Sequence, residues 1–512
     1  MSDVDVLLIN PAMDTEDWAE FESLGLGYLS SMLNHAGYTS KILANDLNFL
    51  DMKEKAEIIC QIPSKIYGFT VFQSTLRETM DIIAIMRQKG VNSHIILGGN
   101  FPTHCSKEIF ERYTTIDSIC IGEGEETLLE LTRKITSGEE WHHVKGIAYS
   151  HNGTVVVSPP RPLIGNLDEL PFPERIAFKG MEYYRMVSRS RGCYAHCTFC
   201  TIQSFYSLCP GPQWRGRSPQ NVADEIEEIV KKFSVHHIIF SDDNFFGRKG
   251  DEDRIEAMVE ELHKRNVRIS FALVCRANDI VDYRDVFTYL AENGLTIVCV
   301  GIESGVQRVL NTFKKGTTVE INRKSLKILR DLGISFKYGF IMFDPYTTMD
   351  EVGENYTFLK RVGYCLAQTL YNRYMVFPGA PLAEKLRREG KITEDFPYYY
   401  YNIDDPEVEQ LSENAAKCFQ QCFDLDRKIT TFKIKMLCSL SKDENPQYDW
   451  LSDEFTKFET ALSTFYLEQF KVLCSNGEES VELITEQVTL MLNKSLRTLE
   501  DLDKTFREIK GV

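Results

Sequence analysis

Short apolar runs alternate with amphipathic segments through the first 145 residues of the chain. The runs predict five strands, at Val4–Ile9, Lys41–Leu43, Ile66–Val71, His94–Leu97 and Ser118–Ile121. Segments with helical spacing lie between them, at Leu26–His35, Thr75–Lys89 and Glu126–Thr136. Strands that alternate with helices in this way predict an α/β fold, in which helices cover both faces of a parallel sheet.

A second alternating region runs from about Met186 to Leu386. Its apolar runs predict six strands, at Met186–Ser190, His237–Ser241, Ile269–Cys275, Thr296–Ile302, Ser335–Phe343 and Thr369–Phe377. Amphipathic helices are predicted between them, including Pro219–Phe233, Asp253–Asn266, Tyr283–Asn293 and Thr318–Leu332. Six strand–helix units predict a partial (β/α)6 barrel, whose chemistry should lie at the carboxyl ends of the strands.

The pattern weakens between and after these two regions. Residues 146–184 hold a hairpin-like stretch and a proline-rich stretch, which predict an ordered linker between a first domain of residues 1–145 and a barrel domain of residues 185–386. Residues 387–512 are rich in Lys, Glu, Leu and Phe and predict a mostly helical third domain. Its aromatic patch, Phe396–Asp404, is interpreted as core or domain interface, with closure over the barrel mouth as a weaker alternative.

Composition narrows the class of protein. The 512 residues include 58 Lys and Arg against 75 Asp and Glu, a net charge of -17, which argues against a general nucleic-acid binder. No apolar run reaches the ~18 residues that a membrane span needs, and no basic leader precedes the first apolar run. The 14 cysteines do not resemble a secreted disulfide framework. We therefore expect a cytoplasmic enzyme with no membrane or nucleic-acid partner.

The most specific chemical signal is the segment RGCYAHCTFC, which places Cys193, Cys197 and Cys200 directly after the first barrel strand. Zinc sites usually need four ligands in two separated pairs. Three closely spaced thiolates can instead hold three irons of a [4Fe–4S] cluster and leave the fourth iron open. Two alternatives stay open: Cys209 completes a four-ligand site, or the cysteines are structural.

This motif, with Phe199 before its third cysteine, resembles the radical S-adenosylmethionine (SAM) superfamily. Further segments resemble that superfamily in order along the barrel, namely SDDNF at 241–245, Arg276, GIESG at 301–305, GFIM at 339–342 and FPGAPL at 377–382. The resemblance implies a SAM site formed by Asp242, Asp243, Arg276, Glu303, Ser304 and Phe340. For the two aspartates a structural role as strand-end caps or partners of Arg276 is an equal alternative.

Four segments of the first domain, namely Asn10–Pro11, LGLGYL at 24–29, LGGNFPT at 97–103 and IGEGEET at 121–127, follow one another along the chain. In this order they resemble the Rossmann-like cobalamin-binding domain of one radical SAM subgroup. Small residues after its strands would let a corrin ring approach the backbone. The implied cobalamin contacts are Gly98, Gly99, Asn100, Gly122, Gly124 and Glu125, although the glycines alone are also typical of tight turns. The stretch NPAMDTEDW lacks the histidine of a D-x-H-x-x-G motif. Gln73 and Ser74 are weak candidates for the cobalt face, with helix capping as their alternative.

The resemblance implies an enzyme that uses a [4Fe–4S] cluster, SAM and cobalamin, with an external electron donor of flavodoxin or ferredoxin type. It implies that a 5′-deoxyadenosyl radical activates a carbon of a small molecule or peptide, to which methylcobalamin then supplies a methyl group. A rearrangement or cyclisation with the same cofactors is the main alternative. A thiomethylating enzyme would need further clustered cysteines and a basic domain, and a sensor would not need the SAM contacts. The sequence identifies no acid or base.

Overall fold

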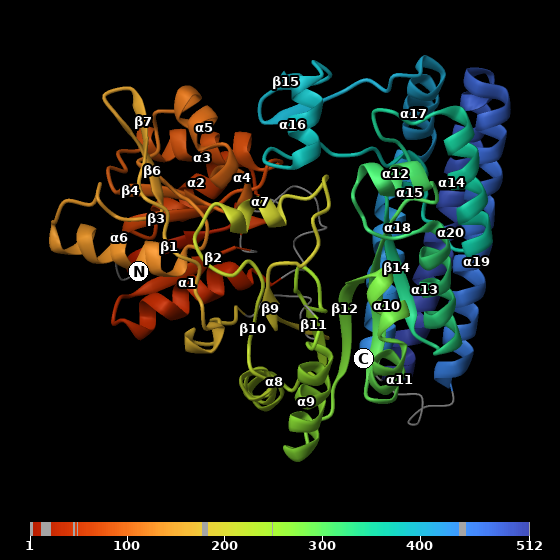
Figure 1. Ribbon diagram of the computed structural model, residues 1–512, viewed down its shortest axis with the longest axis horizontal. Coiled ribbons are helices and arrows are strands. Elements are labelled where there is room, and N and C mark those ends of the chain that lie inside the picture. The colour runs from red at the N-terminus through yellow and green to blue at the C-terminus, as the bar shows by residue number, and fades with distance from the viewer. Residues whose placement is uncertain are drawn as a thin grey trace. The chain divides into compact units, whose positions relative to one another are not determined.

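The computed structural model describes residues 4–11, 22–44, 47–48, 50–176, 183–247, 249–439 and 447–510 (Figure 1). The chain divides into two compact units, each described by itself below. The first unit comprises residues 1–233, 240–265 and 376–400, and the second comprises residues 234–239, 266–375 and 401–512.

The first unit contains a seven-stranded sheet with the order β2-β1-β3-β4-β5-β6-β7. Its five parallel strands are β1 (Val4–Ile9), β2 (Ser40–Leu43), β3 (Ser64–Thr70), β4 (His94–Gly98) and β5 (Ser118–Cys120). The predicted hairpin forms β6 (Ile147–His151) and β7 (Thr154–Val157), which continue the sheet in antiparallel direction. All five strands predicted from apolar runs are confirmed.

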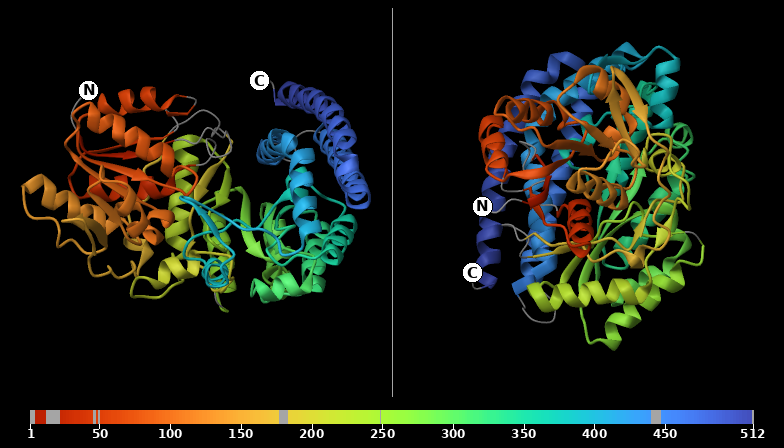
Figure 2. Two further views of the ribbon diagram at one scale, coloured as in Figure 1. Left: turned by 90° about the horizontal axis from the view of Figure 1, so that it is seen from above. Right: turned by 90° about the vertical axis from the view of Figure 1, so that its left-hand side faces the viewer.

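Helices cover both faces of this sheet (Figure 2). Leu7 and Ile9 of β1 belong to a core that includes residues of α2 (Met52–Cys60), α3 (Leu76–Gln88) and α5 (Ser106–Arg112). Val6 and Leu8 point to the other face and belong to a core that includes residues of α1 (Leu24–His35) and α6 (Glu125–Ser137). Because both faces are buried, β1 is a continuous apolar run with no polar alternation.

The first unit also holds short elements from the barrel region and from the later segment 376–400. In chain order they are β8 (Arg185–Val187), β9 (Ser190–Arg191), α7 (Ile202–Ser207), β10 (Arg215–Gly216), α8 (Pro219–Phe233), α9 (Glu252–Lys264), α16 (Pro381–Arg388), β15 (Thr393–Asp395) and β16 (Tyr398–Tyr400). Strands β9 and β10 pair antiparallel, with Arg191 opposite Arg215. This pairing brings together Arg191, which precedes the three cysteines, and Arg215, which follows them.

The second unit contains the parallel strands β11 (His237–Phe240, to residue 239), β12 (Ser270–Arg276), β13 (Leu295–Glu303) and β14 (Ser335–Phe340), paired in that order. Between them run α10 (Ala277–Asp282), α11 (Arg284–Glu292), α12 (Gln307–Thr312) and α13 (Val319–Asp331), and α14 (Met349–Val362) follows β14. Strand–helix alternation with parallel pairing confirms the predicted partial-barrel type of sheet.

The predicted sixth strand, Thr369–Phe377, is wrong. Its first residues belong to a short helix, α15 (Ala367–Tyr371). The backbone N–H of Gln368 donates to Oδ2 of Asp426 at 2.9 Å, so the Asp426 side chain supplies an acceptor to the first turn of this helix. What remains of a strand is one parallel bridge between Phe343 and Arg373.

The C-terminal part of the second unit is helical, as predicted. It consists of α17 (Pro406–Phe419), α18 (Phe423–Ser439), α19 (Gln447–Asn476) and α20 (Val481–Lys510), and the two long helices α19 and α20 pack against each other (Figure 1). Aromatic contacts support the bundle, such as the edge-on pair Phe419 and Tyr466 with ring centroids 6.2 Å apart. Among the described residues, no helix is long and apolar enough to cross a membrane.

Candidate functional site

A cavity of about 370 Å³ lies within the first unit, at the carboxyl edge of its parallel sheet. The strand ends β1, β3, β4 and β5 contribute to its wall, together with the first turns of α1 and α6. Residues around the cysteine motif line the same cavity, namely Ser188, Ser190, Arg191, Phe205, Tyr206, Ser241 and Asp243. The edge of an open parallel sheet is where ligands bind in folds of this type.

Five of the eight predicted cobalamin contacts line this cavity: Gly98, Gly99, Gly122, Gly124 and Glu125. Gly122 has φ +81°, and a Cβ there would lie 2.7 Å from Sγ of Cys209. A side chain at this position would therefore strain the backbone and overlap a buried sulfur. Glycine at this position therefore allows both the left-handed backbone and the close approach of Cys209.

The other three predicted contacts lie elsewhere. Asn100 begins the short helix α4 (Asn100–His104). Gln73 Nε2 donates to the carbonyl of Pro397 at 2.8 Å, and the hydroxyl of Tyr398 donates to the carbonyl of Ser74 at 3.3 Å. Gln73 and Ser74 therefore hold the aromatic segment that contains β16 and are not among the residues that line the cavity.

Residues 396–400 of the aromatic patch belong to the first unit and lie against the predicted cobalamin domain. Arg77 Nη2 pairs with Oδ1 of Asp395 at 2.6 Å and donates to the carbonyl of Phe396 at 2.9 Å. The guanidinium of Arg112 lies 4.4 Å from the ring centroid of Phe396. These contacts agree with the interpretation of the patch as packing surface.

The sequence stretch that lacks a histidine includes residues 12–18, which lie outside the described residues.

Buried ion pairs contribute to the cavity wall through Arg191, Glu123 and Glu125. Arg191 Nη1 lies 2.9 Å from Oε1 of Glu123, and its Nη2 lies 2.6 Å from Oε1 of Glu125. Arg215 Nη1 pairs with the same Glu123 at 2.8 Å. Burial alone would raise the pKa of Glu123, but the two guanidinium groups outweigh it and hold that pKa below its ordinary value. Glu123 is therefore an anion that bridges two arginines.

The three motif cysteines lie on the loop between β9 and α7 and are half-buried. The loop begins at Gly192, whose φ is +87° and where a Cβ would overlap the carbonyl oxygen of Gln213. Backbone N–H groups point at two of the sulfurs: Ala195 donates to Sγ of Cys193 at 3.4 Å, and Ile202 donates to Sγ of Cys200 at 3.5 Å. Such N–H groups stabilise thiolates and tune iron–sulfur clusters.

This donor set fits an iron–sulfur cluster better than a single ion. Among the described residues, no three His, Cys, Asp or Glu side chains are grouped to hold one metal ion. Thiolates of a cluster each bind a different iron, so their sulfurs need not converge on one point. Burial raises the pKa of Cys200 to about 11, which favours the thiol until a cation binds. Cys209 is buried and packs beside Gly122.

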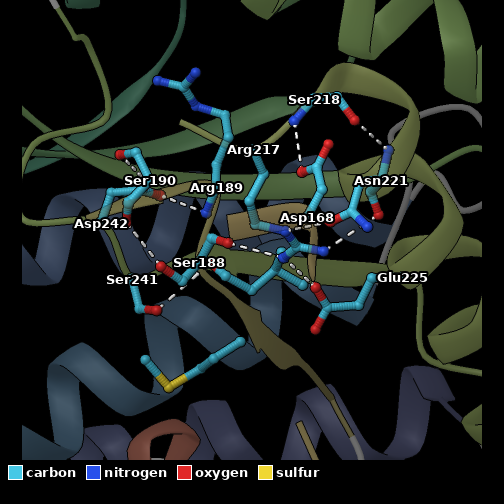
Figure 3. A network of polar contacts seen from close by, with 12 residues as sticks. Asp168, Ser188, Arg189, Ser190, Arg217, Ser218, Asn221, Glu225, Ser241 and Asp242 are labelled. Carbon is cyan, nitrogen blue, oxygen red and sulfur yellow. Dashed lines mark hydrogen bonds and ion pairs between the residues drawn. The ribbon is translucent and has the colours of Figure 1, made fainter. Parts of the chain in front are cut away.

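The two aspartates after β11 have different surroundings. Asp242 is buried and accepts hydrogen bonds from the Ser190 hydroxyl and, at 3.4 Å, from the backbone N–H of Arg189 (Figure 3). Burial raises its pKa to about 6, although Arg189 lowers it. Asp243 lines the cavity and accepts from the backbone N–H of Gly192 at 2.9 Å. Asp242 therefore supports the strand ends, whereas Asp243 is available to the cavity.

In the second unit, Glu303 occupies a β-bulge at the end of β13 with φ +63°, an uncommon conformation for this residue type. Its Oε1 lies 2.8 Å from Nζ of Lys315, and a Cβ at Gly339 would lie 3.2 Å from its Oε2. Arg276 donates to the carbonyl of Lys315. A strained backbone held by surrounding contacts is common at binding sites.

Two other predicted SAM residues make interior contacts in this unit. Ser304 is fully buried and bonds through its hydroxyl to Oδ1 of Asn355 at 3.1 Å. The ring of Phe340 is also buried and stacks on Phe358, with centroids 6.0 Å apart. The structure therefore links Arg276 and Glu303 through Lys315, while the side chains of Ser304 and Phe340 pack inside the unit.

Sequence reasoning missed several residues of these sites. Arg191 and Glu123 lie inside the quoted motifs, but the sequence analysis predicts roles for neighbouring cysteines and glycines and none for these two residues. Tyr206 lines the cavity, and Lys315 pairs with Glu303, yet neither belongs to a motif. Only the contacts made in the folded chain reveal these two.

Comparisons with known proteins agree with this geometry. The profile of the radical SAM superfamily matches residues 187–359, and that of the B12 binding domain matches residues 19–132. An uncharacterized methyltransferase of Pyrococcus horikoshii is 30% identical over 369 residues, which cover 70% of this chain and 77% of that protein. The chain belongs to the radical SAM superfamily. With its B12 binding domain, it is a cobalamin-dependent radical SAM enzyme, whose cofactors are a [4Fe–4S] cluster, SAM and cobalamin.

Other relatives of this radical SAM enzyme include a cyclase and two proteins of known structure. An anaerobic magnesium-protoporphyrin IX monomethyl ester cyclase of Rubrivivax gelatinosus is 28% identical over 435 residues, 82% of this chain and 75% of that protein. The solved structure of the cobalamin-dependent SAM radical enzyme OxsB, with aqua-cobalamin and SAM bound, has a TM-score of 0.76 at 21% identity and covers 98% of this chain and 81% of that one. The methyltransferase TsrM from Kitasatospora setae has a TM-score of 0.63 at 18% identity and covers 80% and 79%. These two structures confirm the fold.

Proposed function

We propose that this radical SAM enzyme methylates an unactivated carbon of a small molecule or peptide. The observation that carries the proposal is the single cavity lined both by the glycine-rich sheet edge and by residues around the cysteine loop. A methyl donor at the sheet edge and a radical generator at the loop would share that cavity. Transfer of a methyl group to a carbon radical needs such proximity. The methyltransferase relative from Pyrococcus horikoshii supports the same outcome.

In this proposal each group of residues has a defined task. Cys193, Cys197 and Cys200 hold the cluster, and the glycines of the sheet edge leave room for the corrin. Within the second unit, Arg276 and Glu303 are the SAM contacts of the proposal, and the ion pair of Glu303 with Lys315 orients the carboxylate. When bound, these cofactors supply a radical on the substrate and a methyl group to transfer to it. The apolar residues of the cavity exclude water from the reacting centre. We expect an external electron donor of flavodoxin or ferredoxin type.

A second candidate function keeps the cofactors but transfers no methyl group. The cyclase of Rubrivivax gelatinosus aligns with 82% of this chain, which favours a cyclisation or another rearrangement as the alternative. Both reactions would use the same cysteine loop and sheet edge. Their difference lies in the fate of the SAM methyl group.

The test follows that methyl group. The reconstituted protein would be incubated anaerobically with SAM labelled in its methyl group, cobalamin and a low-potential reductant. If the enzyme is a methyltransferase, three products should form: methylcobalamin that carries the label, S-adenosylhomocysteine that has lost it, and 5′-deoxyadenosine. If 5′-deoxyadenosine forms while the label stays in methionine, the methyltransferase proposal is wrong and the rearrangement is favoured. The Cys200→Ala variant is the control, because it should abolish 5′-deoxyadenosine and still allow methylation of chemically reduced cobalamin.

A further inference from the structure

Arg191 occupies a position between the cysteine loop and the glycine-rich sheet edge. It is separated from Cys193 only by Gly192, whose backbone N–H is held by Asp243 at 2.9 Å. A displacement of Arg191 would therefore move the start of the cysteine loop. The side chain is only 15% exposed and is held by two carboxylates. The guanidinium also lies 5.2 Å from the ring centroid of Tyr28, which lines the cavity.

Glu123 lies on the loop that follows β5, and Glu125 is the first residue of helix α6. Glu123 and Glu125 alternate with Gly122 and Gly124, so the residues that pair with Arg191 adjoin those that leave room at the cavity. Glu123 is fixed further, because its Oε2 accepts the backbone N–H of Ile164 at 2.9 Å. A shift of this loop on ligand binding would be passed to Arg191.

We propose that Arg191 is a positioning residue that couples the two cofactor sites, so that binding of the corrin and of the cluster change each other's affinity. The proposal rests on the cofactor-binding residues named under the proposed function. The coupling runs from Gly122 and Gly124 through Glu125 to Arg191 and then along the chain to Cys193. Thermodynamic linkage requires the effect to be reciprocal, and such couplings typically amount to roughly 5- to 150-fold in affinity.

Arginine suits this task because the several N–H donors of its planar guanidinium group can bind two carboxylates at once. Lysine keeps the charge but provides a single ammonium group, which can satisfy only one of Glu123 and Glu125 in the same geometry. A purely structural role would lower stability without changing the ratio of two affinities. The ratio of the cobalamin affinities measured with and without the cluster therefore distinguishes coupling from a purely structural role.

The experiment measures the dissociation constant of hydroxocobalamin by its absorption spectrum, in protein with and without the reconstituted cluster. The wild type should bind cobalamin about tenfold more tightly when the cluster is present. In Arg191→Lys the ratio should fall close to one, while iron loading without cobalamin stays complete. Glu125→Gln, which leaves the Glu123 contact, provides a second test if Arg191→Lys folds poorly.

Arg161→Lys is the matched control. Arg161 is 17% exposed and also pairs with two glutamates of α6, Glu126 and Glu130, but it does not line the cavity. It should keep the wild-type ratio. A wild-type ratio of one, or an unchanged ratio in both Arg191→Lys and Glu125→Gln, would overturn the proposal while the cofactor assignment stands. Failure of the wild type to bind cobalamin would instead overturn the proposed function and this coupling with it.

Discussion

Nη2 of Arg191 lies 2.6 Å from Oε1 of Glu125, and this pair joins residues that are 66 positions apart in the sequence. One partner leads into the three-cysteine loop, and the other begins helix α6 at the edge of the parallel sheet. Both side chains are largely buried, at 15% and 6% exposure. A buried ion pair contributes little net stability but is sensitive to the loss of one partner. The importance of this ion pair therefore lies in the two segments that it joins and not in its contribution to the free energy of unfolding.

Loss of any one motif cysteine should remove the cluster. Cys193→Ala, Cys197→Ala and Cys200→Ala should each retain little iron after anaerobic reconstitution, because a cluster needs all three thiolates to remain bound. Cys209→Ala should retain the full iron content, since Cys209 packs beside Gly122. Iron analysis of the four variants checks this. Loss of iron in Cys209→Ala would instead favour the four-ligand alternative.

Gly122→Ala should weaken cobalamin binding and destabilise the first unit. The alanine would adopt φ +81° and place its Cβ 2.7 Å from Sγ of Cys209, and such strain and overlap cost about 1–3 kcal/mol each. Gly138→Ala shares the left-handed backbone, with φ +73°, but has no atom within 4 Å of the added Cβ. Urea unfolding should show a larger loss for Gly122→Ala, and Cys209→Ala should restore part of it. Equal losses in the two glycine variants would show that the overlap is unimportant.

Lys315→Met should strongly destabilise the second unit and weaken SAM binding. Removal of the ammonium leaves the carboxylate of Glu303 buried without its ion-pair partner, a change that typically costs about 3–5 kcal/mol. Lys327→Met removes an exposed pair with Asp331 and should cost less than about 1 kcal/mol. Chemical unfolding and SAM titration of the cluster-loaded protein measure both effects. If Glu303→Gln in the Lys315→Met background recovers no stability, the buried carboxylate is not the cause.

The contribution of Asp426 to the stability of the second unit should fall as pH rises from about 4 to about 7. Burial raises the pKa of Asp426 from 3.8 to about 7, while hydrogen bonds from Gln368 and Ala367 lower it. Between these values the unfolded chain releases the proton and the folded chain keeps it, so unfolding becomes easier by up to about 1.4 kcal/mol for each pH unit. Asp426→Asn should remove this slope and keep an acceptor for the Gln368 N–H. Urea midpoints measured at several pH values test it, and parallel curves would contradict it.

The sequence predicted the strands and helices well where local pattern determines them. Val4–Ile9 is apolar throughout because both faces of its sheet are covered, so the run itself indicates a buried strand. The segment Thr369–Phe377 failed because a residue 58 positions away, Asp426, stabilises a helix there. No local pattern contains that contact.

The same limit applies to the candidate sites. Glycines after strands and clustered cysteines have local signatures, so the sequence alone predicts Gly98, Gly99, Gly122 and the three-cysteine loop as site residues, and the structure places these three glycines at the cavity. The pairing of Arg191 with Glu123 joins residues 68 positions apart, and the role of each is visible only when the chain is folded. Gln73 and Ser74 were assigned from their place after a strand, but their contacts to the aromatic segment come from residues more than 300 positions away.

The most direct test of the central claim is the cofactor content of the protein purified anaerobically and reconstituted with iron, sulfide and hydroxocobalamin. Iron analysis and mass analysis of the bound corrin would be read together with the ultraviolet–visible spectrum. If each chain binds one [4Fe–4S] cluster and one cobalamin, the analysis should find about four irons and about one cobalamin per chain. Zinc in place of iron, with no bound corrin, would contradict the account.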